Sequence, residues 1–134
     1  CKVSEREQIQ SSEKAYKLLL SVFDTETIQY RESLKMLLLN RANKVLGICS
    51  ISEGGTNETS ADLHLIMQAA ILGNAFGIIL AHNHPSGHLK PSLADDQLTQ
   101  RVKEVTKLLD IHLHDHLIIT DESYYSYADE GHII

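Results

Sequence analysis

The sequence has few residues that could cross-link the chain or anchor it in a membrane. Its 134 residues include two cysteines, Cys1 and Cys49, which are too few and too far apart for a disulfide framework or a CxxC metal site. No run approaches the roughly 18 apolar residues of a membrane-spanning helix, and residues 1–6 lack the apolar segment of a signal peptide. We therefore expect a cytoplasmic protein without membrane association, stabilised by its hydrophobic core.

Basic residues are outnumbered by acidic ones. The chain has 12 Lys and Arg residues against 18 Asp and Glu residues, which gives a net charge of −6. Broad binding to a phosphate backbone depends on positive charge, so we do not expect this domain alone to bind nucleic acid. The sequence also lacks the His-x-Glu and Pro-Cys-x-x-Cys motifs of zinc nucleobase deaminases, which excludes that class of enzyme.

The composition, with 43% hydrophobic and 22% charged residues, is typical of one globular domain. No linker, repeat or low-complexity segment divides the chain, so we assign residues 1–134 to a single domain with a core of about 11–134 and an extension over 1–10. Apolar patterns indicate an α/β fold in which helices cover a mixed sheet. The predicted helices span residues 12–23, 63–71 and 93–109, and the predicted strands span 34–40, 45–51, 77–82 and 111–120.

Histidine is unusually frequent, with eight residues in the chain. His82 and His84 lie two apart at the end of the predicted central strand, so their side chains share a face about 7 Å apart along the backbone. Asp95 falls in the first turn of the next helix and could supply an oxygen ligand. Two imidazoles and one carboxylate leave a fourth position open for water, as in catalytic zinc sites. The alternative is that the histidines are two polar residues at a strand end.

The beginning of the helix predicted over residues 93–109 allows two interpretations. Ser92 and Asp95 have the spacing of a capping box, which satisfies the free amide groups of a helix start. The Ser92 hydroxyl could also donate a hydrogen bond to a charged oxygen beside a metal. Asp96 is a competing carboxylate, but one residue along a helix rotates a side chain by about 100°, so Asp95 and Asp96 cannot both face one ion.

Residues 82–95 resemble the signature of the JAMM (MPN+) metalloproteases, which is His-x-His, seven residues, Ser, two residues and Asp. Within it, the run His-Asn-His-Pro-Ser-Gly over residues 82–87 resembles the RadC family more narrowly, as do residues 115–119 and 126–131. The resemblance implies a three-layer α/β/α JAMM/MPN-like fold, related to that of cytidine deaminases. It also implies a Zn²⁺ ion held by His82, His84 and Asp95, with Ser92 as the donor to the oxyanion, and it favours Asp95 over Asp96.

The resemblance further implies a general base. JAMM enzymes use a glutamate just before an early strand, and Glu32 occupies that place in this sequence. Glu53, beside a glycine-rich loop, is the second candidate, and the alternative for Glu32 is a solvated carboxylate at the beginning of a strand. A metal lowers the pKa of bound water toward about 7, so that a neighbouring carboxylate can remove its proton. The implied activity is hydrolysis of a peptide or isopeptide bond in a peptide or protein substrate.

A second hypothesis is a metal-stabilised interaction module without catalytic activity, associated with DNA repair or other DNA transactions. RadC-like proteins carry a DNA-repair name, but their usual helix-hairpin-helix region does not fit within these 134 residues and the net charge gives no support. The chain also has Ser60-Ala61-Asp62 where the family usually has a proline-arginine-glutamate run. The sequence indicates no particular oligomeric state.

Two other groups of side chains allow more than one interpretation. His112, His114 and His116 alternate along the last predicted strand, so all three should share one face while Asp115 points the other way. They could form a second metal site or an exposed strand face, and the RadC resemblance gives counterparts only to Asp115 and His116. Tyrosines at positions 124, 125 and 127 could stack on bases but more simply cover an edge of the sheet.

Overall fold

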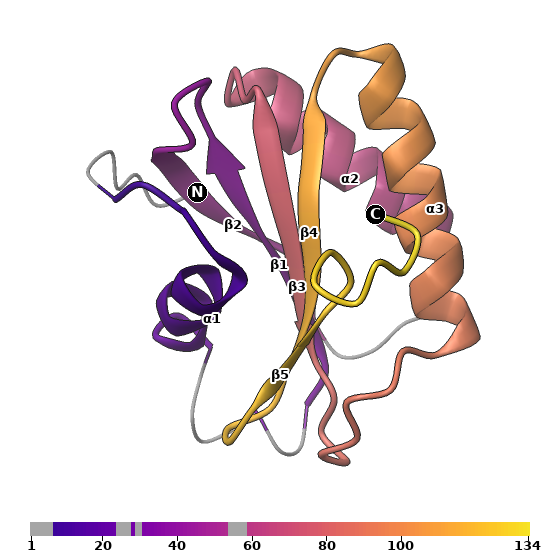
Figure 1. The fold of residues 1–134 in the computed structure, drawn as a ribbon. Coiled ribbons are helices and arrows are strands. Elements are labelled where there is room, and N and C mark those ends of the chain that lie inside the picture. The colour runs from indigo at the N-terminus through magenta and orange to yellow at the C-terminus, as the bar shows by residue number, and fades with distance from the viewer. Residues whose placement is uncertain (1–6, 24–27, 29–30, 54–58) are drawn as a thin grey trace.

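In the computed structural model, the described residues are 7–23, 28, 31–53 and 59–134. They form three helices and five strands, which are arranged as the α/β fold predicted from the sequence (Figure 1). The helices are α1 (Ser12–Leu20), α2 (Thr59–Leu72) and α3 (Leu93–Leu108). The strands are β1 (Ser33–Leu39), β2 (Val45–Glu53), β3 (Gly77–Asn83), β4 (His112–Ile119) and β5 (Tyr124–Ser126).

The strands form one mixed sheet in the order β2-β1-β3-β4-β5. The hairpin of β1 and β2 is antiparallel, β1 also pairs antiparallel with β3, and β3 pairs parallel with β4. Strand β3 is therefore central, and all seven of its residues are buried. Since β1 and β3 run in opposite directions, the residues just before β1 lie beside the carboxyl end of β3.

Helices cover both faces of the sheet and give three layers (Figure 1). Alternate residues of β3 point to opposite faces, so Ile78 and Leu80 pack with residues of α2 and α3, whereas Ile79 and Ala81 pack with residues of α1. By the same alternation His82 faces α3 and Asn83 faces the α1 side. Among the described residues, no helix is long and apolar enough to cross a lipid bilayer.

The elements differ from the sequence prediction in several respects, and helix α2 begins at Thr59, four residues earlier than predicted. Helix α1 ends at Leu20, three residues earlier than predicted, and β5 was not predicted as a strand. Tyr124 and Tyr125 belong to β5, which forms the edge of the sheet beside β4. A further difference is a bulge in β4: Ile78 pairs with Leu113 and Ile79 with Asp115, so the register skips His114.

The bulge reverses the alternation of β4. Leu113 packs on the α2 and α3 side, whereas Leu117 and Ile119 pack on the α1 side. The prediction that His112, His114 and His116 share one face is therefore wrong, because it assumed an unbroken strand. His116 is turned toward α3 and is fully buried, while His114 lies over Gly77, where an added Cβ would come within 2.5 Å of its Nε2 atom.

Candidate metal centre

Four side chains with metal-ligating atoms meet at the carboxyl end of β3. They are Glu32, His82, His84 and Asp95, and one ligand atom from each lies within 4.8 Å of all the others. His82 and His84 stand at the end of β3, Asp95 in the first turn of α3, and Glu32 just before β1. Glu32 reaches the histidines because Leu34 of β1 pairs with His82 of β3. The fold thus brings together the three predicted metal ligands and the predicted general base.

The spacing of the ligand atoms suits a small divalent cation. The Nε2 atoms of His82 and His84 are 2.8 Å apart, and the Asp95 carboxylate oxygens Oδ1 and Oδ2 lie 3.1 Å from Nε2 of His82 and His84, respectively. Ligands at about 2.0–2.1 Å from a tetrahedral ion are separated by about 3.3 Å, close to these distances. Imidazole lone pairs and carboxylates so near each other repel unless protons or a cation lie among them, so the donor set fits a metal ion.

The other ring nitrogens are already engaged. His84 Nδ1 lies 2.7 Å from the carbonyl oxygen of His88, which can only accept, so Nδ1 carries the proton and Nε2 keeps its lone pair. His82 Nδ1 lies 2.8 Å from Nε2 of the buried His116. Both histidines therefore present Nε2 to the cluster, and in His84 this nitrogen is free to ligate.

The cluster also shifts the proton affinities of its members. Burial alone would raise the pKa of Asp95, but the imidazoles of His82 and His84, which donate hydrogen bonds to it when their Nε2 atoms are also protonated, outweigh burial and hold the pKa well below the usual carboxyl range. The hydrogen bond to Asp95 raises the pKa of His84 in turn. Asp95 is therefore an anion that attracts positive charge, whether protons or a metal.

Ser92 and Asp95 form the predicted capping box at the beginning of α3. Ser92 Oγ accepts a hydrogen bond from the Asp95 amide at 3.1 Å, and the Ser92 amide donates to Asp95 Oδ2 at 2.8 Å. The box fixes the Asp95 side chain beside His84. The Ser92 side chain is exposed, and its hydroxyl proton is not used in the cap, so it can donate to a bound molecule.

Asn83 is a site residue that the sequence analysis did not single out. Asn83 lies between the two histidines in the sequence and is fully buried, but its side chain points to the opposite face of the sheet. Its amide nitrogen donates to the carbonyl oxygens of Ile28 and Arg31 at 2.7 and 2.8 Å, and its Oδ1 accepts from the Ser33 amide at 2.7 Å. These bonds hold the segment on either side of Glu32 against the end of β3.

Several other candidates lie elsewhere. Asp96 accepts hydrogen bonds from the Tyr127 hydroxyl at 2.8 Å and from His132 Nε2 at 2.9 Å, which separates it from the metal cluster. Glu53 ends β2, and its side chain lies outside the described residues. Within the described part of the chain, His112 and His114 belong to no group of three potential metal ligands.

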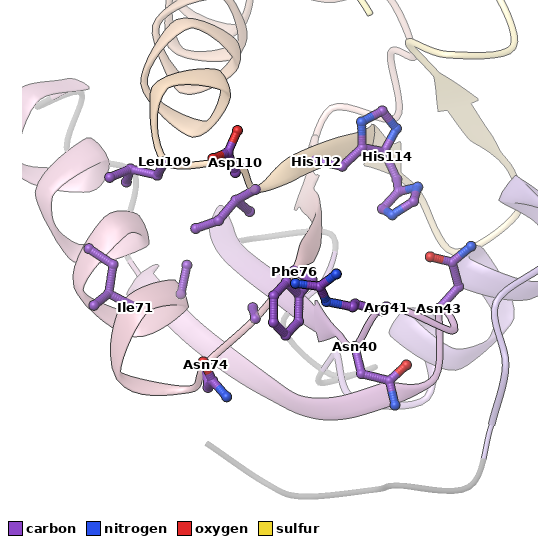
Figure 2. A pocket seen from close by; sticks show the side chains of 13 residues that line it. Asn40, Arg41, Asn43, Ile71, Asn74, Phe76, Leu109, Asp110, His112 and His114 are labelled. Carbon is purple, nitrogen blue, oxygen red and sulfur yellow. The ribbon is translucent and has the colours of Figure 1, made fainter.

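A cavity of about 1060 Å³ lies at the other end of the sheet (Figure 2). Arg41 in its wall rests over the Phe76 ring at 4.3 Å, and the rings of His112 and His114 meet edge to face at 4.3 Å. These residues surround the amino ends of β3 and β4, whereas His82 and His84 stand at the carboxyl end of β3. The cavity is therefore separate from the metal cluster.

Comparison with known proteins decides the family. A family model described as the RadC-like JAB domain matches residues 9–132. The chain belongs to the RadC family. It is 50% identical over 127 residues to a UPF0758 protein of Porphyromonas gingivalis, an alignment that covers 94% of this chain and 55% of that protein. It is 38% identical over 130 residues to a UPF0758 protein of Streptococcus gordonii, covering 97% and 56%. The chain thus spans about half the length of these RadC relatives, and the match confirms the resemblance seen in residues 82–95.

Proposed function

We propose that this RadC domain is a zinc-dependent hydrolase that cleaves a peptide or isopeptide bond in a peptide or protein substrate. The observation that carries the proposal is the meeting of Glu32, His82, His84 and Asp95 within 4.8 Å in a RadC-like JAB domain. Three of these residues come from the signature at positions 82–95, and the fourth, Glu32, stands just before β1 and is distant in sequence.

Each residue of the cluster has a role in the proposal. His82 Nε2, His84 Nε2 and the Asp95 carboxylate would hold the ion. When bound, zinc supplies Lewis-acid polarisation of a carbonyl and lowers the pKa of water to about 7. Glu32 would take a proton from the attacking water on its carboxylate and transfer it to the nitrogen of the leaving amine. This use of one carboxylate as base and then acid needs no covalent intermediate on the protein.

Ser92 would stabilise the charge that develops on the substrate carbonyl oxygen. Its Oγ keeps one proton to donate, and the capping box fixes its position one helical turn from Asp95. A donor that is oriented before the reaction lowers the barrier because it needs no rearrangement when the charge forms. The same side chain would thus cap α3 and serve the reaction.

The test is hydrolysis of a library of peptides and isopeptide-linked lysine conjugates by the zinc-loaded protein. We expect wild type to cleave, Glu32→Gln to bind zinc without cleaving, and His82→Ala to lose both zinc and cleavage. Glu104→Gln is the control, because Glu104 is an exposed carboxylate on α3 away from the cluster. If wild type and His82→Ala are equally inactive across the library while wild type binds zinc, the enzyme proposal fails in favour of an interaction module.

A further inference from the structure

A fully buried histidine lies behind the metal cluster and outside it. His116 of β4 has no exposed surface, and each of its ring nitrogens has one partner. Its Nε2 lies 2.8 Å from Nδ1 of His82, and its Nδ1 lies 2.5 Å from Oγ1 of Thr99 on α3. Thr99 is also fully buried. His116 thus connects a helix hydroxyl to a predicted metal ligand.

The direction of each hydrogen bond between Thr99, His116 and His82 follows from the partner of the Thr99 hydroxyl. The Thr99 hydroxyl donates to the backbone carbonyl of Asp95 at 2.7 Å, and a carbonyl can only accept. Thr99 has no second proton, so its oxygen must accept from Nδ1–H of His116. The partners of its two ring nitrogens are Thr99 Oγ1 and His82 Nδ1, and neither is a carboxylate. A neutral imidazole carries a single proton, and here that proton is on Nδ1.

The same reasoning gives the position of the proton on His82, the metal ligand beside His116. With its proton on Nδ1, His116 has a lone pair on Nε2 and accepts a hydrogen bond from Nδ1–H of His82. His82 in turn keeps the lone pair on Nε2, the atom that faces His84 and Asp95. In the reverse order, with Thr99 donating to His116, the proton of His82 would be on Nε2 and this nitrogen could not ligate a cation.

The ring plane of His116 is also fixed. The Tyr127 ring stacks on it with centroids 4.9 Å apart and planes 7° apart. Tyr127 is held in turn by its hydroxyl, which donates to Asp96 at 2.8 Å. This packing restrains the ring from tilting away from His82 or Thr99.

We propose that Thr99 and His116 are positioning residues that hold His82 in the tautomer protonated at Nδ1, the form that can ligate a metal through Nε2. The proposal rests on the proposed function, since it assigns these two residues to the same metal centre. Partners behind ligating histidines typically change metal affinity by 10- to 100-fold when they are removed.

The experiment compares two threonines of α3. Thr99 and Thr106 are both buried, and each donates its hydroxyl to the carbonyl four residues earlier, but only Thr99 contacts His116. Zinc affinity of the 134-residue protein is measured by competition with a chromophoric chelator. We expect Thr99→Val to bind zinc 10- to 100-fold more weakly than wild type, and Thr106→Val to match wild type within twofold.

Substitutions of His116 provide a second comparison. His116→Leu removes the acceptor for His82 and should weaken zinc binding at least as much, whereas His116→Gln offers a carbonyl oxygen to Nδ1–H of His82 and should recover part of the affinity. Nitrogen-15 shifts of the imidazoles should show His82 protonated at Nδ1 in wild type and at Nε2 in Thr99→Val. Equal zinc affinity and equal shifts in wild type and Thr99→Val would overturn the proposal.

The failure of this inference can be distinguished from that of the proposed function. If His82→Ala abolishes zinc binding while Thr99→Val leaves it unchanged, the metal centre stands and the positioning role falls. If His82→Ala binds zinc as wild type does, the metal centre is wrong and the positioning role falls with it.

Discussion

Substitution of Asn83 by leucine should weaken both the fold and the placement of Glu32. The side chain is fully buried and makes three hydrogen bonds to backbone groups of Ile28, Arg31 and Ser33. Leucine has the same branched shape and number of heavy atoms but cannot form hydrogen bonds, so three backbone groups lose their partner. A lost bond of this kind costs about 1 kcal/mol when water can replace it and up to about 3 kcal/mol when it cannot. We expect the free energy of unfolding to fall by about 3 kcal/mol or more.

Urea unfolding followed by circular dichroism, in the presence of a chelator, measures this loss without any contribution from metal. The zinc-loaded variant should in addition keep its zinc affinity within about threefold, because His82, His84 and Asp95 do not depend on the bonds of Asn83. Its kcat should fall, because the segment that carries Glu32 is released. Stability within 1 kcal/mol of wild type together with unchanged kcat would refute the role given to Asn83.

Two further predictions separate structural from chemical effects. His114 is half-buried, and burial lowers its pKa to about 4, so the unfolded chain binds a proton that the folded chain does not between about pH 6.5 and pH 4. The free energy of unfolding should therefore fall by about 1–2 kcal/mol as the pH drops through this range, after allowance for solvent screening. In urea titrations at several pH values, His114→Gln should reduce this dependence of stability on pH. An identical dependence in wild type and His114→Gln would contradict the assignment. At the helix cap, Ser92→Ala should cost about 1 kcal/mol and Ser92→Gly only a few tenths, yet both should lower kcat by about 10²–10³ because both lack the donor hydroxyl. The two variants are compared by initial rates and thermal melts. If kcat falls only in the less stable Ser92→Ala and is kept in Ser92→Gly, Ser92 acts only as a helix cap.

The local parts of the site could be predicted from the sequence. His82, His84, Ser92 and Asp95 lie between the end of β3 and the first turn of α3, so their spacing in the sequence places them near one another. The position of Glu32 depends on the antiparallel pairing of β1 with β3, which the residues do not specify, and the resemblance to JAMM enzymes supplied it. The central strand and the α/β layering followed from apolar patterns that the structure confirms.

The parts that could not be predicted depend on contacts distant in sequence. The bulge at His114 lies where this side chain packs over Gly77 of β3, a contact distant in sequence, and the alternation assumed for β4 failed there. Asn83, Thr99 and His116 are buried polar residues that lie close to other polar residues in the sequence. Such residues have no spacing to recognise, although a polar side chain in a buried strand must find a partner, and this was the available signal.

The most direct test of the metal centre is X-ray absorption at the zinc edge of the purified, zinc-loaded protein, with zinc counted per chain. The account predicts one zinc per chain, coordinated by two imidazole nitrogens and by oxygen donors, and a loss of this zinc in Asp95→Ala. Protein that stays free of zinc, or zinc coordination that is unchanged in Asp95→Ala, would contradict it.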